Sequence, residues 1–262
     1  MTDDHVRFER DGSVGVLTFN RPERLNALSG RMVRQARERI AELEGDATFR
    51  VLIVTGEGRG FCSGADLGGD ARLEASAGAL GAQMERGING LVAALREARF
   101  PTIAAVNGPA AGAGVGLALA CDFLIAAQSM RLLLTFGRIG LAMDGGVSQF
   151  LTEIVGRRRA GAAAMLMEPI DADRALDWGL AWRAVPDETL TAEARALAGR
   201  LADGPPLAYA AMKRQLQAAT RLGLRETLQM EAEAQDALIR TADAQGAIAA
   251  YRNRQAPRFE GR

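Results

Sequence analysis

The chain has 262 residues, of which 48% are hydrophobic and 24% charged, a composition typical of globular proteins with a sizeable core. Its 32 Lys and Arg residues balance 32 Asp and Glu residues, so a nucleic-acid-binding surface is not expected. No apolar run reaches the roughly 18 residues of a membrane-spanning helix, and the polar start of the chain is unlike a secretory signal. With only two cysteines, we expect a cytoplasmic location and no disulfide framework.

The scarce residues narrow the possible chemistry. His5 is the single histidine, and we expect it in a frayed terminus. A Ser-His-Asp or Cys-His device and a structural zinc site are therefore not predicted. Carboxylates, backbone amides or a bound cofactor must carry any catalysis, and the 30 glycines favour binding by the backbone.

In chain order, strand-like and helical patterns alternate over the first two thirds of the sequence. Residues 6–10 and 14–20 predict a hairpin, and Ser29 is a candidate N-cap for a helix that reaches Leu43. Residues 51–55 and 102–106 are continuous apolar runs, as expected of buried parallel strands. Further strands are predicted at 123–127 and 131–135. This alternation predicts an α/β fold.

The pattern changes after Pro186, where no strand signal remains. Helical apolar spacing then recurs in three segments, at 191–202, 206–219 and 224–240. We therefore predict an α/β core over residues 1–186 and a helical C-terminal region over 187–262.

Two glycine-rich turns, 61–66 and 107–116, follow the buried strands. Such turns leave backbone N–H groups free for an anion or a polarised carbonyl oxygen, and two converging donors would form an oxyanion hole. Tight structural turns have the same composition, so glycine content leaves both interpretations open. A dinucleotide fingerprint is disfavoured because Leu117 occupies the place of its third glycine.

Asp144 lies between Met143 and two glycines, where poor solvation would raise its pKa toward that of a general acid or base. The alternative is an N-cap for a helix that begins near Gly146. Cys62 has no histidine partner and is interpreted as a small packed side chain. Trp178 and Trp182 are expected in the core.

With these motifs, the chain resembles the crotonase (enoyl-CoA hydratase/isomerase) superfamily over nearly its whole length. The resemblance rests on Asn20-Arg21-Pro22, Asn26-Ala27-Leu28, the segment 61–67, the glycine-rich segment 104–116, Ala120-Cys121-Asp122 and the ending 256–262. It implies a spiral of repeated ββα units and a helical C-terminal region that forms a homotrimer or a dimer of trimers. It also implies an acyl-CoA thioester substrate and no separate cofactor or metal, since coenzyme A is part of the substrate.

The resemblance also implies site residues. The thioester carbonyl would be held by the backbone N–H groups of Ala65 and Ala113. The positions that correspond to coenzyme A contacts are Arg24, Ala27, Ser63, Asp66, Leu67 and, from a neighbouring subunit, Phe259.

The departures from the family pattern concern the acids. The two glutamates of typical hydratases correspond to Gly116 and Phe136 here, so both carboxylates are missing. Asp144 corresponds to the acid/base aspartate of some isomerases, and the segments around it look like the branch of ring-1,2-epoxyphenylacetyl-CoA isomerase in phenylacetate breakdown. We interpret the chain as an acyl-CoA isomerase. The alternatives are an enoyl-CoA hydratase with an unusual water-activating group and a catalytically silent acyl-CoA binding protein.

Overall fold

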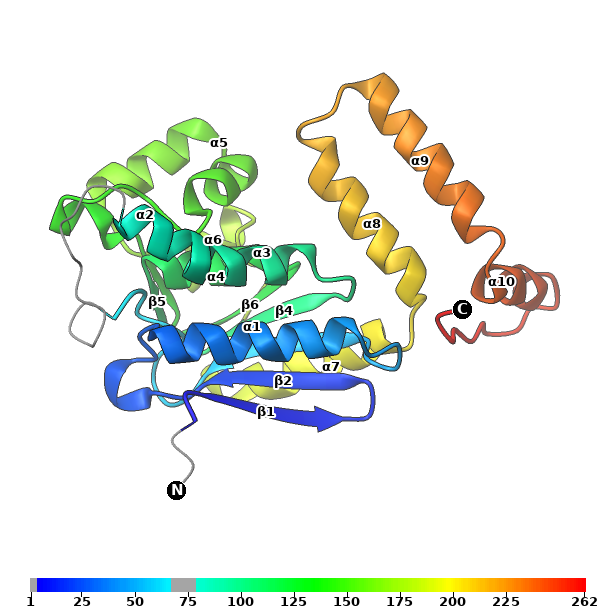
Figure 1. Cartoon of the computed structure of the whole chain (residues 1–262), viewed down its shortest axis with the longest axis horizontal. Coiled ribbons are helices and arrows are strands. Elements are labelled where there is room, and N and C mark those ends of the chain that lie inside the picture. Colours follow the sequence, from blue (N-terminus) through cyan, green and yellow to red (C-terminus); the bar gives the residue numbers. More distant parts are fainter. Residues whose placement is uncertain (1–3, 67–78) are drawn as a thin grey trace.

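A six-stranded sheet forms the centre of the computed structural model, which describes residues 4–66 and 79–262 (Figure 1). Its strands, in order across the sheet, are β1 (Val6–Asp11), β2 (Val14–Phe19), β3 (Val51–Gly56), β4 (Thr102–Val106), β6 (Phe123–Ala127) and β9 (Arg183–Val185). The first two pair antiparallel as the predicted hairpin, and all later neighbours pair in parallel. The predicted α/β class is confirmed.

A smaller sheet begins within the second glycine-rich turn. It contains β5 (Pro109–Ala111), β7 (Arg131–Leu133) and β8 (Ile170–Asp171). The strand predicted at 131–135 is therefore shorter than expected. The chain leaves the sheet at Leu134 and enters a 3-10 helix, η3 (Thr135–Ile139), which buries Phe136 instead of continuing the ladder.

Helices cover both faces of the central sheet, which explains why β3 and β4 are apolar on both sides. On one face lie α1 (Gly30–Glu44), α3 (Gly90–Glu97) and α4 (Ala113–Ala120); on the other lies α7 (Leu190–Ala202). The α1 helix begins as predicted, because the Ser29 hydroxyl accepts a hydrogen bond from Met32 N at 3.1 Å.

The remaining elements connect these layers. They are η1 (Pro22–Arg24), α2 (Ala79–Met84), η2 (Glu85–Asn89), α5 (Val147–Leu166), α6 (Ala172–Asp177) and η4 (Asp187–Thr189). Across the described residues, every helix is too short or too polar to span a bilayer.

The last three helices extend away from the sheet as an arm (Figure 1). They are α8 (Pro206–Ala219), α9 (Leu224–Leu238) and α10 (Ala242–Arg252). The first two confirm predicted helices, and α10 lies in a segment for which the sequence predicted no element. Lys213 fastens α8 to the core by donating to Asp122 Oδ2 at 2.7 Å and to the carbonyls of Leu95 and Phe100.

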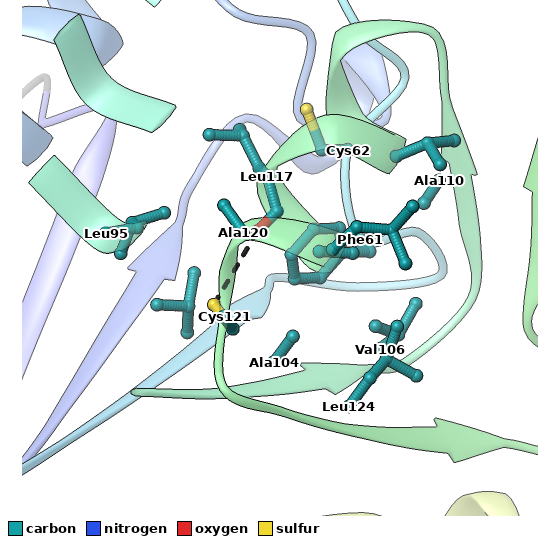
Figure 2. Packing of buried hydrophobic residues seen from close by; sticks show 14 of the residues in the cluster. Phe61, Cys62, Leu95, Ala104, Val106, Ala110, Leu117, Ala120, Cys121 and Leu124 are labelled. Atoms are coloured by element: carbon teal, nitrogen blue, oxygen red, sulfur yellow. Dashed lines mark hydrogen bonds between the residues drawn. The ribbon is translucent and has the colours of Figure 1, made fainter. Parts of the chain in front are cut away.

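Both cysteines pack inside the core on the α4 side of the sheet (Figure 2). Cys121 Sγ contacts the carbonyl of Leu117 at 3.6 Å, and burial raises the pKa of each thiol to about 12. A thiol that is protonated at neutral pH is a poor nucleophile, so the interpretation of Cys62 as a packed side chain is confirmed.

Two smaller expectations are wrong. His5 is not frayed, since its ring nitrogen lies 2.7 Å from the Ser29 hydroxyl and its backbone N–H donates to Gln35. Trp182 is 41% exposed because it precedes the edge strand β9, where its ring packs against Phe123 and the Arg183 guanidinium.

Candidate active site

The two glycine-rich turns meet at the carboxyl ends of β3 and β4. Cys62 and Ala110 form an isolated parallel bridge, and Ala111 N donates to the Cys62 carbonyl at 2.8 Å. Gly64 has a φ of +87°, and a Cβ there would lie only 2.7 Å from the Ala111 carbonyl oxygen. Only glycine allows this close approach, which places Ala65 beside the first residue of α4, Ala113.

Two backbone N–H groups are left without a partner at this junction. Within the described residues, neither Ala65 N nor Ala113 N donates a hydrogen bond, whereas Gly112 N, just before Ala113, donates to Leu133 O at 3.0 Å. Ala113 begins α4, so its N–H belongs to the unsatisfied first turn of a helix. Both alanines line one cavity. Two such donors can bind a polarised carbonyl oxygen or an oxyanion.

The cavity has a volume of about 1110 Å³ and runs between α1 on one side and α2, η2 and α3 on the other. Around the two alanines its wall includes the apolar residues Leu28, Leu141, Ala142 and Met143, together with two carboxylates. Farther along, the described wall carries charged side chains, namely Arg34, Arg37, Glu38, Glu44, Arg86 and Glu97. This size is at the upper end for pockets that hold drug-sized ligands.

Asp144 lines the same cavity and is half-buried. Its Oδ1 atom is buried without a hydrogen-bond partner in the described structure. Burial raises the pKa of Asp144 above its usual value because the charged form loses solvation. The alternative interpretation as an N-cap is wrong: α5 begins after Gly146, no side chain caps it, and only the Asp144 backbone carbonyl accepts a bond, from Val147 N.

Asp66 is the second carboxylate at the cavity wall, and it is held differently. It is 9% exposed and forms an ion pair with Arg21 at 2.8 Å. The same Arg21 guanidinium donates to the Ala27 carbonyl at 2.7 Å, and Arg21 N donates to the buried Asn26 side chain. Sequence reasoning used Arg21 and Asn26 only as part of a motif and missed this framing role.

None of the other predicted contacts in the described residues lines the cavity wall. Arg24 is exposed, Ala27 is buried, and the Ser63 hydroxyl donates to the Arg24 carbonyl at 3.1 Å. Leu67 lies outside the described residues. Phe259 is in the C-terminal tail, where its carbonyl accepts from Arg50 at 2.7 Å.

Both positions that correspond to hydratase glutamates lack a carboxylate and are closely packed. A Cβ at Gly116 would overlap the Gly145 carbonyl group, whose carbon would lie 2.9 Å away. Phe136 is 8% exposed, and its ring lies 3.7 Å from the Cβ position of Gly112. Among the described residues, moreover, no cluster of three His, Cys, Asp or Glu side chains could hold a metal ion.

Comparison with known proteins identifies the family. The profile of the enoyl-CoA hydratase/isomerase family matches residues 9–262. The chain is 39% identical to 1,2-epoxyphenylacetyl-CoA isomerase of Escherichia coli (strain K12), with 95% of each chain covered. It is equally identical to a "probable enoyl-CoA hydratase" of Rhodobacter capsulatus, with 98% of each covered.

Solved structures agree with this result. An enoyl-CoA hydratase from Polaromonas sp. JS666 superposes with a TM-score of 0.91 at 32% identity, covering 97% of this chain and 99% of that one. The chain therefore belongs to the enoyl-CoA hydratase/isomerase family and has the crotonase fold.

Proposed function

We propose that the protein is an acyl-CoA isomerase that moves a proton along a coenzyme A thioester with Asp144 as its acid/base. One observation carries the proposal. Within the described structure, a half-buried carboxylate with an unpartnered oxygen lines the same cavity as two unpartnered backbone N–H groups. The donors suit a carbonyl oxygen, and the carboxylate suits a proton on a neighbouring carbon.

The chemistry follows from this pairing. The N–H groups of Ala65 and Ala113 donate to the thioester oxygen and so acidify the carbon next to the carbonyl. The Asp144 carboxylate removes a proton from that carbon or its vinylogous position, which breaks a C–H bond and leaves an enolate. The same carboxyl group returns the proton to a different carbon, so no water is added. Its raised pKa brings the carboxylate closer to the basicity that this transfer needs.

The proposal includes the rest of the ligand site and the assembly. Arg24, Ala27, Ser63, Asp66 and Leu67 would contact the coenzyme A moiety, together with Phe259 of a neighbouring subunit. We propose a homotrimer or a dimer of trimers built by residues 187–262. The arm supports this, since α9 contains no buried residue and Leu224 and Leu228 are 75% and 54% exposed. Two buried, unpaired cysteines favour a reducing cytoplasm.

A second candidate function is hydration of an enoyl-CoA, which the name of the Rhodobacter relative favours. It requires groups that orient and split water. Gly116 and Phe136 supply no such group, so we favour isomerisation. The name of the Escherichia relative adds epoxyphenylacetyl-CoA to the substrates worth testing.

The test is a panel of unsaturated acyl-CoA thioesters incubated in deuterated water and followed by mass spectrometry and NMR. We expect a shifted double bond and deuterium incorporation at carbon. Efficient conversion of crotonyl-CoA to a product heavier by one water would establish the hydratase instead. Tight binding without turnover across the panel would establish a silent binding protein.

A further inference from the structure

The segment 140–146, which carries Asp144, is held against α4 by a contact between two glycines. Gly116 faces Gly145, and a Cβ at Gly116 would meet three backbone atoms of Gly145, including its Cα at 3.2 Å. Backbone atoms of this kind cannot rotate away as a flexible side chain can. The α4 helix and the segment 140–146 can therefore pack at this distance only while residue 116 has no side chain.

The contact continues to the first residue of α4. A Cβ at Gly145 would lie 3.4 Å from the Ala113 Cα, so the backbone of the segment lies directly on the residue that supplies one of the free N–H groups. Gly145 and Gly146 also have positive φ values of +57° and +78°. The segment thus turns tightly on the start of α4 and leads into α5.

Among the described residues, no hydrogen bond joins the segment to α4, although Gly140 N and Leu141 N bond back to η3. Within the described structure, none of the backbone N–H groups of residues 142–146 donates a hydrogen bond. Their carbonyls accept only from the start of α5, Asp144 from Val147 N and Gly146 from Gln149 N and Phe150 N. The Asp144 side chain, with its unpartnered Oδ1, provides no anchor either. Met143 packs against the core on one side of Asp144, and on the other side the close packing of Gly145 against Gly116 sets how near the backbone can come to α4.

We propose that Gly116 is a positioning residue for Asp144: its missing side chain lets residues 144–146 seat on α4 and places the carboxylate beside the Ala113 N–H. This inference rests on the proposed role of Asp144. It assigns to Gly116 a function beyond helix packing, because a side chain there would lift the acid away from the donors while leaving the donors in place.

Among the described residues, no charged side chain contributes to the pKa shift of Asp144. Neither α4 nor residues 140–146 contains another ionisable side chain, and the other charged groups of the described cavity wall belong to Asp66 and to α1, η2 and α3. Desolvation alone accounts for the raised pKa of Asp144. A movement of the segment toward water should therefore lower that pKa toward its ordinary value.

The experiment compares Gly116→Ala with the wild type, using the 3-enoyl-CoA of the panel that exchanges deuterium fastest. Displacing a reacting group by about 1 Å can cost about 10²-fold in rate, so we expect kcat for exchange to fall by about that factor with little change in KM. The acid limb of the pH–rate profile should move to lower pH, since the active form is the carboxylate. Gly161→Ala in α5 is the matched control, because a Cβ there meets nothing within 4 Å; it should behave as wild type.

The outcomes separate the two proposals. An active Asp144→Asn variant refutes the proposed function itself. If Asp144→Asn is inactive but Gly116→Ala keeps the wild-type rate and profile, only the positioning role is overturned; a lower rate with an unmoved profile also overturns it. If thermal melting shows that Gly116→Ala does not fold, Gly145→Ala provides the test, and a folded Gly145→Ala protein with wild-type rate and profile overturns the inference.

Discussion

The two sides of the cavity are built by different kinds of interaction. The donor side, with Ala65 and Ala113, is cross-linked by backbone hydrogen bonds between the two turns and by the Arg21–Asp66 ion pair. The acid side, residues 140–146, meets α4 through glycine packing, with no hydrogen bond to that helix within the described structure. Hydrogen bonds and an ion pair therefore hold the donor side in place, whereas close packing positions the acid side against α4. This difference suits their tasks, since an oxyanion hole works by preorganisation and an acid/base needs a poorly solvated environment.

The largest expected effect is on the acid side. Asp144→Asn keeps the size of the side chain but removes proton transfer, which is worth about 10²–10⁴-fold in rate. We expect deuterium exchange into the thioester to fall by that range, measured by mass spectrometry. Thioester affinity should change little. Asp177→Asn, at an exposed aspartate, is the control. Equal activity of the two variants would show that Asp144 does not transfer the proton.

On the donor side, Ala65→Pro removes one N–H group. Loss of one oxyanion-hole donor costs about 10²–10³-fold in rate, and we expect turnover to fall within that range. Ala65→Gly retains the N–H and should keep most activity. Because proline also restricts the backbone, circular dichroism must show that the variant is folded; a folded variant with wild-type turnover would remove Ala65 from the site.

The ion pair between Arg21 and Asp66, which supports the donor side, is tested through the free energy of unfolding. Arg21→Ala removes a guanidinium that serves both Asp66 and the Ala27 carbonyl. Breaking a buried ion pair costs roughly 3–5 kcal/mol, and we expect at most about 3 kcal/mol here because the Arg21 side chain is 14% exposed. Urea unfolding measures the change. Arg24→Ala is the matched control, and equal losses in the two variants would contradict the framing role.

The smallest expected effect is a pH-dependent change in melting temperature on the acid side. Burial raises the pKa of Asp144 in the folded protein, so the folded state binds this proton more tightly than the unfolded state. Stability from this group is present below the ordinary aspartate pKa and is lost as pH rises through the raised native pKa. Asp144→Asn should therefore melt at a higher temperature than wild type near neutral pH, with the advantage disappearing in acid. If the melting temperatures of the two proteins differ by the same amount at every pH in this window, burial does not destabilise the charged carboxylate of Asp144.

Local signals in the sequence were sufficient where one segment sets its own structure. The hairpin at β1 and β2, the Ser29 cap of α1 and the helices α7 to α9 all follow from short-range periodicity and capping. The strand expected to continue through residue 135 stopped early because the burial of Phe136 competes with sheet pairing.

The sequence by itself determined the fold class, the family motifs and the unusual setting of Asp144 between glycines. Only the tertiary structure decided that Asp144 does not cap α5, that Asp66 pairs with Arg21, and that Gly116 touches Gly145. The physical reason is distance along the chain. Capping and periodicity act within a few residues, whereas these contacts join segments that are brought together only when the parallel strands align their carboxyl ends at one cavity.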